Sequence, residues 1–145
     1  MTKPLMERRR IDDGFAVVLR RGAAVHDSLV QLAREENLRA GFVTGLGAFE
    51  QAVLAYYDIE QKKYIETPVH GVLEVASLTG NVARVDGEPF AHLHAVVAGR
   101  DLVARGGHLV SARVGATFEM FVRDLGDDIV REYHEDIGLK LWELE

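Results

Sequence analysis

The stretch VLEVASLTGNVARVDGEPFAHLHAVVA, residues 72–98, decides the fold because it contains two apolar runs separated by a strong turn signal. The first run covers residues 72–85 and the second covers residues 90–98. Asp86-Gly87 between them is typical of a tight hairpin turn, so the two runs are predicted to pair as antiparallel strands. The first run is long enough to need a bend, and Gly80-Asn81 is the natural place for it.

Outside this hairpin, most of the chain also favours strands. Short apolar or alternating runs occur at residues 15–19, 41–44, 52–57, 109–114, 117–122 and 139–144. Residues 24–37 differ, because apolar side chains recur there at helical spacing while charged side chains fall between them. One main helix and many strands predict the α+β class with a largely antiparallel sheet.

The chain is predicted to form a single domain. Its 145 residues fall within the usual size of one domain, and 48% hydrophobic residues are enough for a core of its own. Residues 1–13 are polar and are expected to form an arm, which leaves residues 14–145 as the domain. No linker, repeat or low-complexity segment divides them.

Composition narrows the classes of function. The chain has no cysteine, which excludes disulfides and thiolate zinc ligands and suits a reducing compartment. No apolar stretch approaches the ~20 residues of a membrane span, so a cytoplasmic location is expected. The net charge of −6 disfavours nucleic-acid binding, for which Arg8-Arg9-Arg10 and Arg20-Arg21 are the only local support.

The main candidate site consists of His92, His94 and His108. Residues i and i+2 of a strand face the same way, so the first two imidazoles should share one face and could meet one metal ion. Residues 100–107 are expected to return the chain so that His108 lies beside this pair, and Gly106-Gly107 lets the backbones approach closely. Three imidazoles with a free coordination position describe an open metal site.

Another interpretation of these histidines stays open. A histidine pair on one strand face can simply be solvated, or hydrogen-bonded in a polar groove. The remaining histidines are expected to be structural or solvated, because they lie at the start of the helix, in a turn and in the charged tail. They are His26, His70 and His134.

Two glutamates and one glycine-rich segment are further candidates. Glu74 lies between apolar neighbours in a strand, where a buried carboxylate needs a partner, and Glu119 raises the same question. Each could act as a general base, orient a histidine or, as we favour, pair with an arginine. The segment TGLGA, residues 44–48, is interpreted as a tight turn whose N–H groups could contact a cofactor or ligand, at Thr44, Gly45 and Gly47.

Several of these segments together resemble the plants-and-prokaryotes-conserved (PPC) domain, in its prokaryotic stand-alone form. The resemblance covers roughly residues 14–144 and rests on the order of five short motifs. They are TGLGA (44–48), GVLEVASLTG (71–80), PFAHLH (89–94), GGHL (106–109) and GLKL (138–141).

The resemblance implies a fold, an assembly and a metal site. The fold is an antiparallel sheet with one helix packed on a face, and the assembly is a homotrimer. The implied metal ligands are His92, His94 and His108, with zinc as the leading divalent metal. In plants the domain accompanies an Arg-Gly-Arg-Pro AT-hook; this chain lacks that core, so the DNA-binding role of the plant proteins does not carry over directly.

Three functions follow from these expectations. The first is a trimeric metal-binding module for binding or assembly, with a regulatory role and a small ligand or a partner protein. The second is a metal-dependent enzyme on a small-molecule substrate, in which Glu74 or Glu119 moves protons. The third is DNA binding, which the overall charge does not favour.

Overall fold

The hairpin predicted from residues 72–98 organises the structure. It consists of β5 (Leu73–Val85) and β6 (Glu88–Ala98), paired antiparallel along most of their length. Asp86 and Gly87 form the turn with positive φ angles of 50° and 81°, as a two-residue hairpin loop that matches the strand twist requires. The sequence therefore predicts both strands and their connection correctly.

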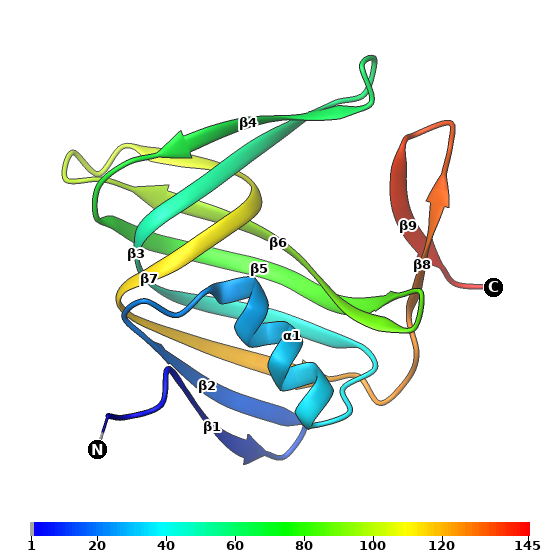
Figure 1. Cartoon of the computed structure of the whole chain (residues 1–145), viewed down its shortest axis with the longest axis horizontal. Coiled ribbons are helices and arrows are strands. Elements are labelled where there is room, and N and C mark those ends of the chain that lie inside the picture. The colour runs from blue at the N-terminus through cyan, green and yellow to red at the C-terminus, as the bar shows by residue number, and fades with distance from the viewer. Residues whose placement is uncertain (1) are drawn as a thin grey trace.

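The computed structural model describes residues 2–145 (Figure 1). It contains one helix, α1 (Val25–Glu35), and a single nine-stranded sheet. The other strands are β1 (Met6–Ile11), β2 (Gly14–Arg20), β3 (Gly41–Asp58), β4 (Lys63–Val69), β7 (Ala104–Asp124), β8 (Val130–His134) and β9 (Leu139–Glu143). Within these residues, no helix is both long enough and apolar enough to cross a membrane.

The sheet is almost wholly antiparallel, which confirms the predicted α+β class. Its order is β1-β2-β7-β3-β5-β8-β9, with β4 added beside β3 and β6 beside both β5 and β7. Only the short contact between β5 and β8 is parallel. Because β6 also pairs with the beginning of β7, the strands β3, β5, β6 and β7 form a closed ring of pairings.

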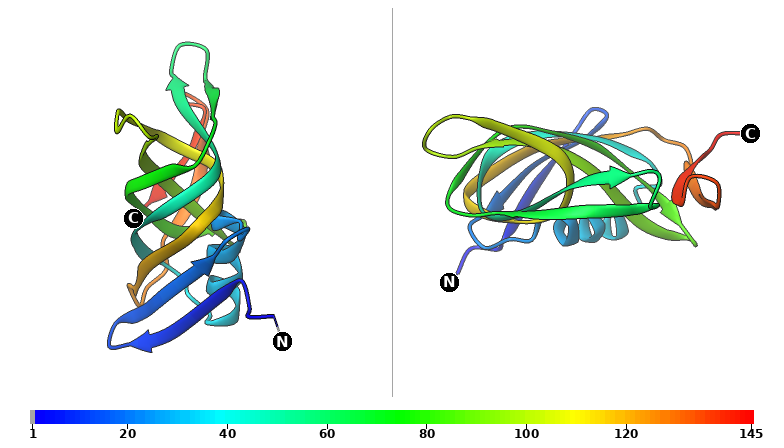
Figure 2. Two further views of the ribbon diagram at one scale, coloured as in Figure 1. Left: turned by 90° about the vertical axis from the view of Figure 1, so that its left-hand side faces the viewer. Right: turned by 90° about the horizontal axis from the view of Figure 1, so that it is seen from above.

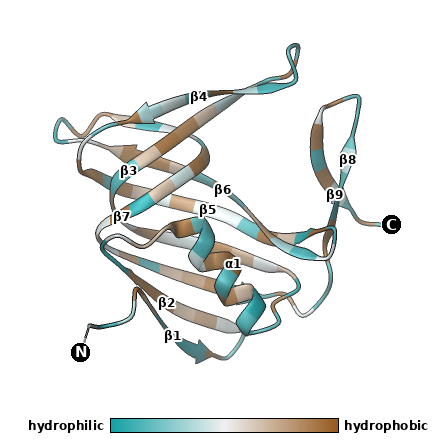
Figure 3. Ribbon diagram, in the orientation of Figure 1, coloured by the Kyte–Doolittle hydropathy of each residue, from teal (hydrophilic) through white to brown (hydrophobic). Residues whose placement is uncertain are grey.

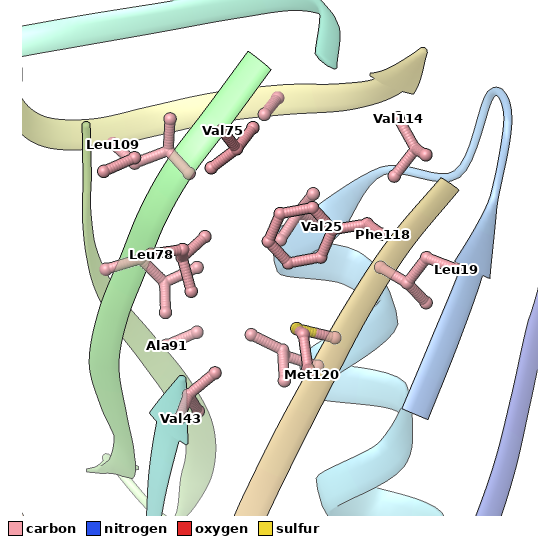
Figure 4. Close-up of a cluster of buried hydrophobic side chains, with 14 of the residues drawn as sticks. Leu19, Val25, Val43, Val75, Leu78, Ala91, Leu109, Val114, Phe118 and Met120 are labelled. Carbon is pink, nitrogen blue, oxygen red and sulfur yellow. The ribbon is translucent and has the colours of Figure 1, made fainter. Parts of the chain in front are cut away.

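Helix α1 lies along one side of the sheet and covers its apolar face (Figures 1 and 2). Its apolar side, coloured brown in Figure 3, packs toward the strands. Val25, Leu29 and Leu32 are buried there. Below the helix, the rings of Phe49 and Phe118 stack with centroids 5.3 Å apart. Figure 4 shows the side chains of this core converging from the helix and from several strands, so the helix and sheet share one core.

The expected turn at residues 44–48 is wrong, because β3 runs straight through them. Their glycines instead let β3 pass close to β7. A Cβ atom on Gly45 would lie 2.7 Å from the carbonyl oxygen of Glu119, and one on Gly47 would lie 2.2 Å from that of Thr117. The register of β3 shifts at this point on both neighbouring strands, so the glycines mark a bulge within a strand.

The expected bend at Gly80-Asn81 is not where the hairpin is irregular. The pairing of β5 with β6 shifts register between Val75 and Ser77 and is regular around Gly80. Gly80 has a different role, because a Cβ atom there would lie 2.0 Å from the carbonyl oxygen of His92. This glycine therefore allows the two strands to approach closely beside the candidate site.

The polar N-terminal residues include a strand. Residues 6–11, expected to belong to an arm, form β1 and pair with β2 along its whole length. Arg8 reaches the end of α1, where its guanidinium contacts Glu36 at 2.7 Å and Glu35 at 2.9 Å. Polarity alone does not distinguish an arm from an exposed edge strand, whose side chains mostly face water.

We predict that Gly47→Ala destabilises the protein by roughly 2 kcal/mol or more, because the added methyl group would overlap the backbone of β7. Gly99→Ala is the matched control, since a Cβ atom there meets only a side-chain oxygen at 3.8 Å. Urea denaturation of both variants measures the difference. Equal midpoints for the two variants would contradict the close approach of β3 and β7.

Candidate metal centre

Strand pairing brings His92, His94 and His108 together. His92 and His94 lie two residues apart on β6, and His94 is directly opposite His108 on β7. The ring centroids are 5.2 Å apart for His92 and His94, 5.3 Å for His92 and His108, and 5.6 Å for His94 and His108. One nitrogen of each ring lies within 4.8 Å of one nitrogen of both others.

The chemistry of these three rings fits a metal ion. Nitrogens bound to one tetrahedral zinc ion lie ~3.4 Å apart, given Zn–N distances of ~2.0–2.1 Å, so small ring rotations would close the set. The Nδ1 atom of His108 is buried and has no hydrogen-bond partner among the described residues. A buried polar atom of this kind usually has a partner, and a bound cation would supply one.

The protonation of two of these rings is suited to metal binding. Burial lowers the pKa of His92 to about 4, and the nearby cation Arg131 acts in the same direction. Burial also lowers the pKa of His108 to about 4, with smaller contributions from His92 and His94. Both imidazoles are therefore neutral at pH 7, and a neutral imidazole offers a free lone pair to a metal.

Tyr64 on β4 holds one ring in place. Its ring stacks on His108 with centroids 4.3 Å apart and planes 20° apart. Tyr57, on the adjoining end of β3, packs against Tyr64 at 4.9 Å. The β3–β4 hairpin thus supports the third histidine from the side opposite β6.

The two hairpins beside the site are joined to each other. Figure 1 shows the β3–β4 and β8–β9 hairpins projecting from the sheet. The hydroxyl group of Tyr57 donates a hydrogen bond to the carbonyl oxygen of Ile137 at 2.6 Å, and Lys62 Nζ donates one to that of Glu135 at 2.6 Å. These contacts form an arch next to the histidines.

Arg131, on β8, is a residue of the site that the sequence does not reveal. Its side chain is only 8% exposed, and its Nη2 atom lies 3.3 Å from Nδ1 of His92. Nη2 also donates to Oδ1 of Asn81 at 2.8 Å, and Nη1 donates to the carbonyl oxygen of Lys140 at 3.0 Å. Burial lowers the pKa of Arg131 from its ordinary value.

Neither Arg131 nor Tyr64 carries a clear signal in the sequence. β4 and β8 are short and mostly exposed, and neither contains a continuous apolar run that would mark it as a strand. The one available signal for β8 is Gly138, whose positive φ of 80° marks the turn into the predicted strand β9. A hairpin predicted from this turn would have placed Arg131 on a strand paired with β9. It would not have indicated that Arg131 lies beside His92.

The two candidate catalytic glutamates lie outside the histidine group. Glu74 is exposed and faces away from the core, opposite Ala48 and Ala98 on the flanking strands. Glu119 is also exposed, between Val18 and Leu46. The expectation that these carboxylates are buried is wrong, because strand alternation turns both toward the outer face of the sheet.

Of the candidate cofactor-binding residues, Thr44 faces that outer side too, whereas Gly45 and Gly47 are paired with the buried residues Met120 and Phe118. Thr44 and Gly45, but not Gly47, line a surface hollow of about 710 Å³ together with Glu119. This hollow and the histidine group have no lining residue in common. The structure therefore separates the glycine-rich segment from the candidate metal centre.

The remaining histidines occupy different settings. His26 is the second residue of α1, and burial lowers its pKa. His70 is exposed and borders a second hollow that His26 also lines. His134 contacts Glu143 across the β8–β9 hairpin at 2.5 Å.

Fold and site together define a small strand-rich domain with a single group of candidate metal ligands in residues 2–145. The Plants and Prokaryotes Conserved (PCC) domain, also abbreviated PPC, matches residues 6–126. The chain belongs to this family. The resemblance inferred from the short motifs is thereby confirmed.

Three solved structures share the fold over almost their whole length. A plant- and prokaryote-conserved protein from Pyrococcus horikoshii is 28% identical, with a TM-score of 0.86 and coverage of 100% of this chain and 99% of that one. A metal-containing protein from Archaeoglobus fulgidus is 32% identical (TM-score 0.84, coverage 98% and 100%). A Bacteroides thetaiotaomicron protein, named for a proposed DNA-binding role, is 26% identical (TM-score 0.92, coverage 97% and 98%). No curated protein matches the chain.

We predict that the metal-free protein loses stability as the pH falls from about 6.5 through about 4. His92 and His108 have lowered pKa values of about 4 in the folded state and an ordinary value of 6.5 when unfolded. Between these values the unfolded chain binds more protons, so their contribution is fully present above 6.5 and is lost as the pH falls. Urea denaturation at several pH values measures this dependence.

The double variant His92→Gln, His108→Gln provides the comparison for this prediction. It should show a shallower loss of unfolding free energy over the same pH range, while any contribution of His26 remains in both proteins. Parallel pH profiles for the two proteins would mean that the two rings are not protected from protonation.

Proposed function

We propose that the chain is a metal-binding domain in which His92, His94 and His108 hold one divalent cation, with zinc as the leading candidate. The convergence of three imidazoles on two paired strands is the observation that carries this proposal. The similar protein from Archaeoglobus fulgidus, described as metal-containing, adds support. Three nitrogen ligands without a thiolate or carboxylate suit zinc and other late transition metals.

Such a site would keep a coordination position for a ligand. The group contains three protein ligands, whereas zinc takes four, so the fourth position is available to water or to a small molecule. A metal bound there would act as a Lewis acid toward that ligand. The protein's own contribution is to orient the rings: Tyr64 stacks on His108, and Gly80 lets β5 approach His92.

We infer that the domain assembles into a homotrimer through the outer face of its sheet. Phe42, Leu46 and Phe121 are exposed there, with Phe121 opposite Thr44 and the other two on the same face of β3. Neighbouring apolar side chains on an open sheet face favour burial against another surface. In this role the domain is an assembly module whose metal site binds a small ligand or stabilises the assembly.

An enzymatic role on a small molecule is the second candidate, supported by the open coordination position. The glutamates first considered for proton transfer do not lie in the histidine group. Tyr64, whose pKa is raised by burial, is the titratable side chain that stacks directly on one of the three histidines. The absence of a carboxylate among the grouped side chains of residues 2–145 favours the binding role over hydrolysis by a general base.

The structure gives DNA binding little local support. Four of the five arginines that could contact phosphates already have carboxylate partners: Arg8 and Arg10 contact Glu36, Arg20 contacts Glu7, and Arg21 contacts Glu50. Arg9 is in none of the ion pairs of residues 2–145. Binding phosphates would require breaking these pairs, in a chain whose net charge is −6.

We predict that the untagged protein binds about one zinc ion per chain and that His94→Ala removes this stoichiometric binding. His70→Ala is the matched control, because His70 is exposed and lies outside the histidine group. Isothermal titration of the chelator-treated protein, with elemental analysis of the purified protein, measures both effects. Equal zinc binding by the His94→Ala and His70→Ala variants would refute the proposed site.

We predict that Phe121→Arg converts the trimer into smaller species, because it places a charge in the proposed interface. Val72→Arg is the control, since Val72 is an exposed valine that precedes β5 and lies outside β3 and β7, the strands that carry the proposed interface residues. Light scattering during size-exclusion chromatography gives the mass of each protein. A monomeric parent protein, or a Phe121→Arg variant that remains trimeric, would contradict assembly through this face.

A further inference from the structure

Arg131 is a buried cation without a carboxylate partner. Its side chain is 8% exposed, and no ion pair of the described residues includes it. Its acceptors, Lys140 O and Asn81 Oδ1, are neutral, and its buried Nε atom has no hydrogen-bond partner within residues 2–145. Buried charges in proteins are normally paired, so this arrangement calls for an anion.

The aromatic neighbours of Arg131 hold the guanidinium in position without neutralising it. Its central carbon lies 5.8 Å from the ring centroid of Phe90 and 5.6 Å from that of Trp142. These rings come from β6 and β9, so side chains of two other strands contact the guanidinium of β8. Cation–π contacts are weaker than a buried ion pair, and they leave the charge available to a ligand.

The contact between Arg131 and His92 cannot persist when His92 binds a metal. A guanidinium only donates hydrogen bonds, so Nδ1 of His92 must accept, and the proton of the neutral ring lies on Nε2. A metal bound at Nδ1 would take the lone pair that accepts from Arg131. A metal bound at Nε2 would move the proton to Nδ1, where it would face another donor.

Metal binding at His92 therefore frees one donor of Arg131 next to the metal. Nε, already without a partner, and Nη2 lie on the same edge of the guanidinium, the edge that forms paired hydrogen bonds with a carboxylate. A metal ion and a guanidinium repel each other across a short distance. An anion placed between them removes this repulsion and supplies both missing partners.

We propose that the site binds a small carboxylate, with one oxygen on the metal and the carboxylate held by Arg131. Contacts between the β3–β4 and β8–β9 hairpins adjoin this position through Tyr57, which packs on Tyr64 beside His108. The proposal rests on the metal site proposed above. Metal and carboxylate should therefore bind cooperatively, because the metal releases the donor that the carboxylate needs.

The test uses Co²⁺ as a spectroscopic stand-in for zinc, with acetate as the probe and acetamide as its neutral counterpart. In buffer without carboxylate or phosphate, acetate should change the visible spectrum of the Co²⁺-loaded protein, and acetamide should not. Arg131→Met removes the charge but keeps an apolar side chain that can pack on Phe90 and Trp142. It should weaken acetate binding by about tenfold or more.

Two further variants test whether the charge and planar edge of Arg131 are what bind acetate. Arg131→Lys keeps the charge without the planar edge and should bind acetate with intermediate affinity. Arg100→Met removes an exposed arginine in the turn after β6 and should bind acetate like the parent protein. Acetate affinity of Arg131→Met within twofold of the parent, or a response to acetamide equal to that to acetate, would overturn the proposal.

A second readout separates a ligand-binding role of Arg131 from a merely structural one. Without acetate, Arg131→Met should bind Co²⁺ at least as tightly as the parent. The substitution removes a positive charge that repels the metal ion and a hydrogen-bond donor that competes with the metal for His92. Weaker Co²⁺ binding would mean that Arg131 only supports the fold, and the proposal would fail. If the parent protein binds no Co²⁺, the proposed metal site is wrong. If it binds Co²⁺ but its acetate affinity does not depend on Arg131, only the proposed carboxylate site is wrong.

Discussion

The pairing of β6 with the beginning of β7 is the constraint on which the rest of the structure depends. It sets His94 directly opposite His108, and strand alternation then places His92 on the same face. The same pairing closes the ring of β3, β5, β6 and β7 around the core. A shift of one residue would exchange the two faces of a strand and place imidazoles on the core side, which Leu93 and Leu109 now occupy, so fold and site are specified together.

The polar groups of the site are held in states that a cation and an anion would complete. Burial lowers the pKa of two imidazoles, which are therefore neutral at pH 7. The guanidinium of Arg131 is also buried, and no carboxylate of residues 2–145 pairs with it. Keeping these groups from water is unfavourable without partners, and the apolar core of the adjoining sheet offsets this cost. The histidines and Arg131 lie on paired strands and not on loops, so the sheet fixes their positions.

The sequence predicted the elements with strong local signals. The β5–β6 hairpin followed from Asp86-Gly87, the helix from its apolar period, and the grouping of three histidines from alternation on a strand. Predictions from the sequence were wrong where a residue's role depends on tertiary contacts. The glycines of residues 44–48 allow β3 to approach β7 closely, and Glu74 faces outward from the sheet. β4 and β8 lack a continuous apolar run, so Tyr64 and Arg131 could not be placed beside the histidines without the structure.

The most direct measurement of the central claim is anomalous X-ray scattering at the zinc edge from crystals of the zinc-loaded protein. We predict one strong peak per chain, ~2.0–2.1 Å from one nitrogen each of His92, His94 and His108. We also predict that Arg131 no longer donates to His92. A zinc peak elsewhere, with the three rings free of metal, would contradict the proposed metal site.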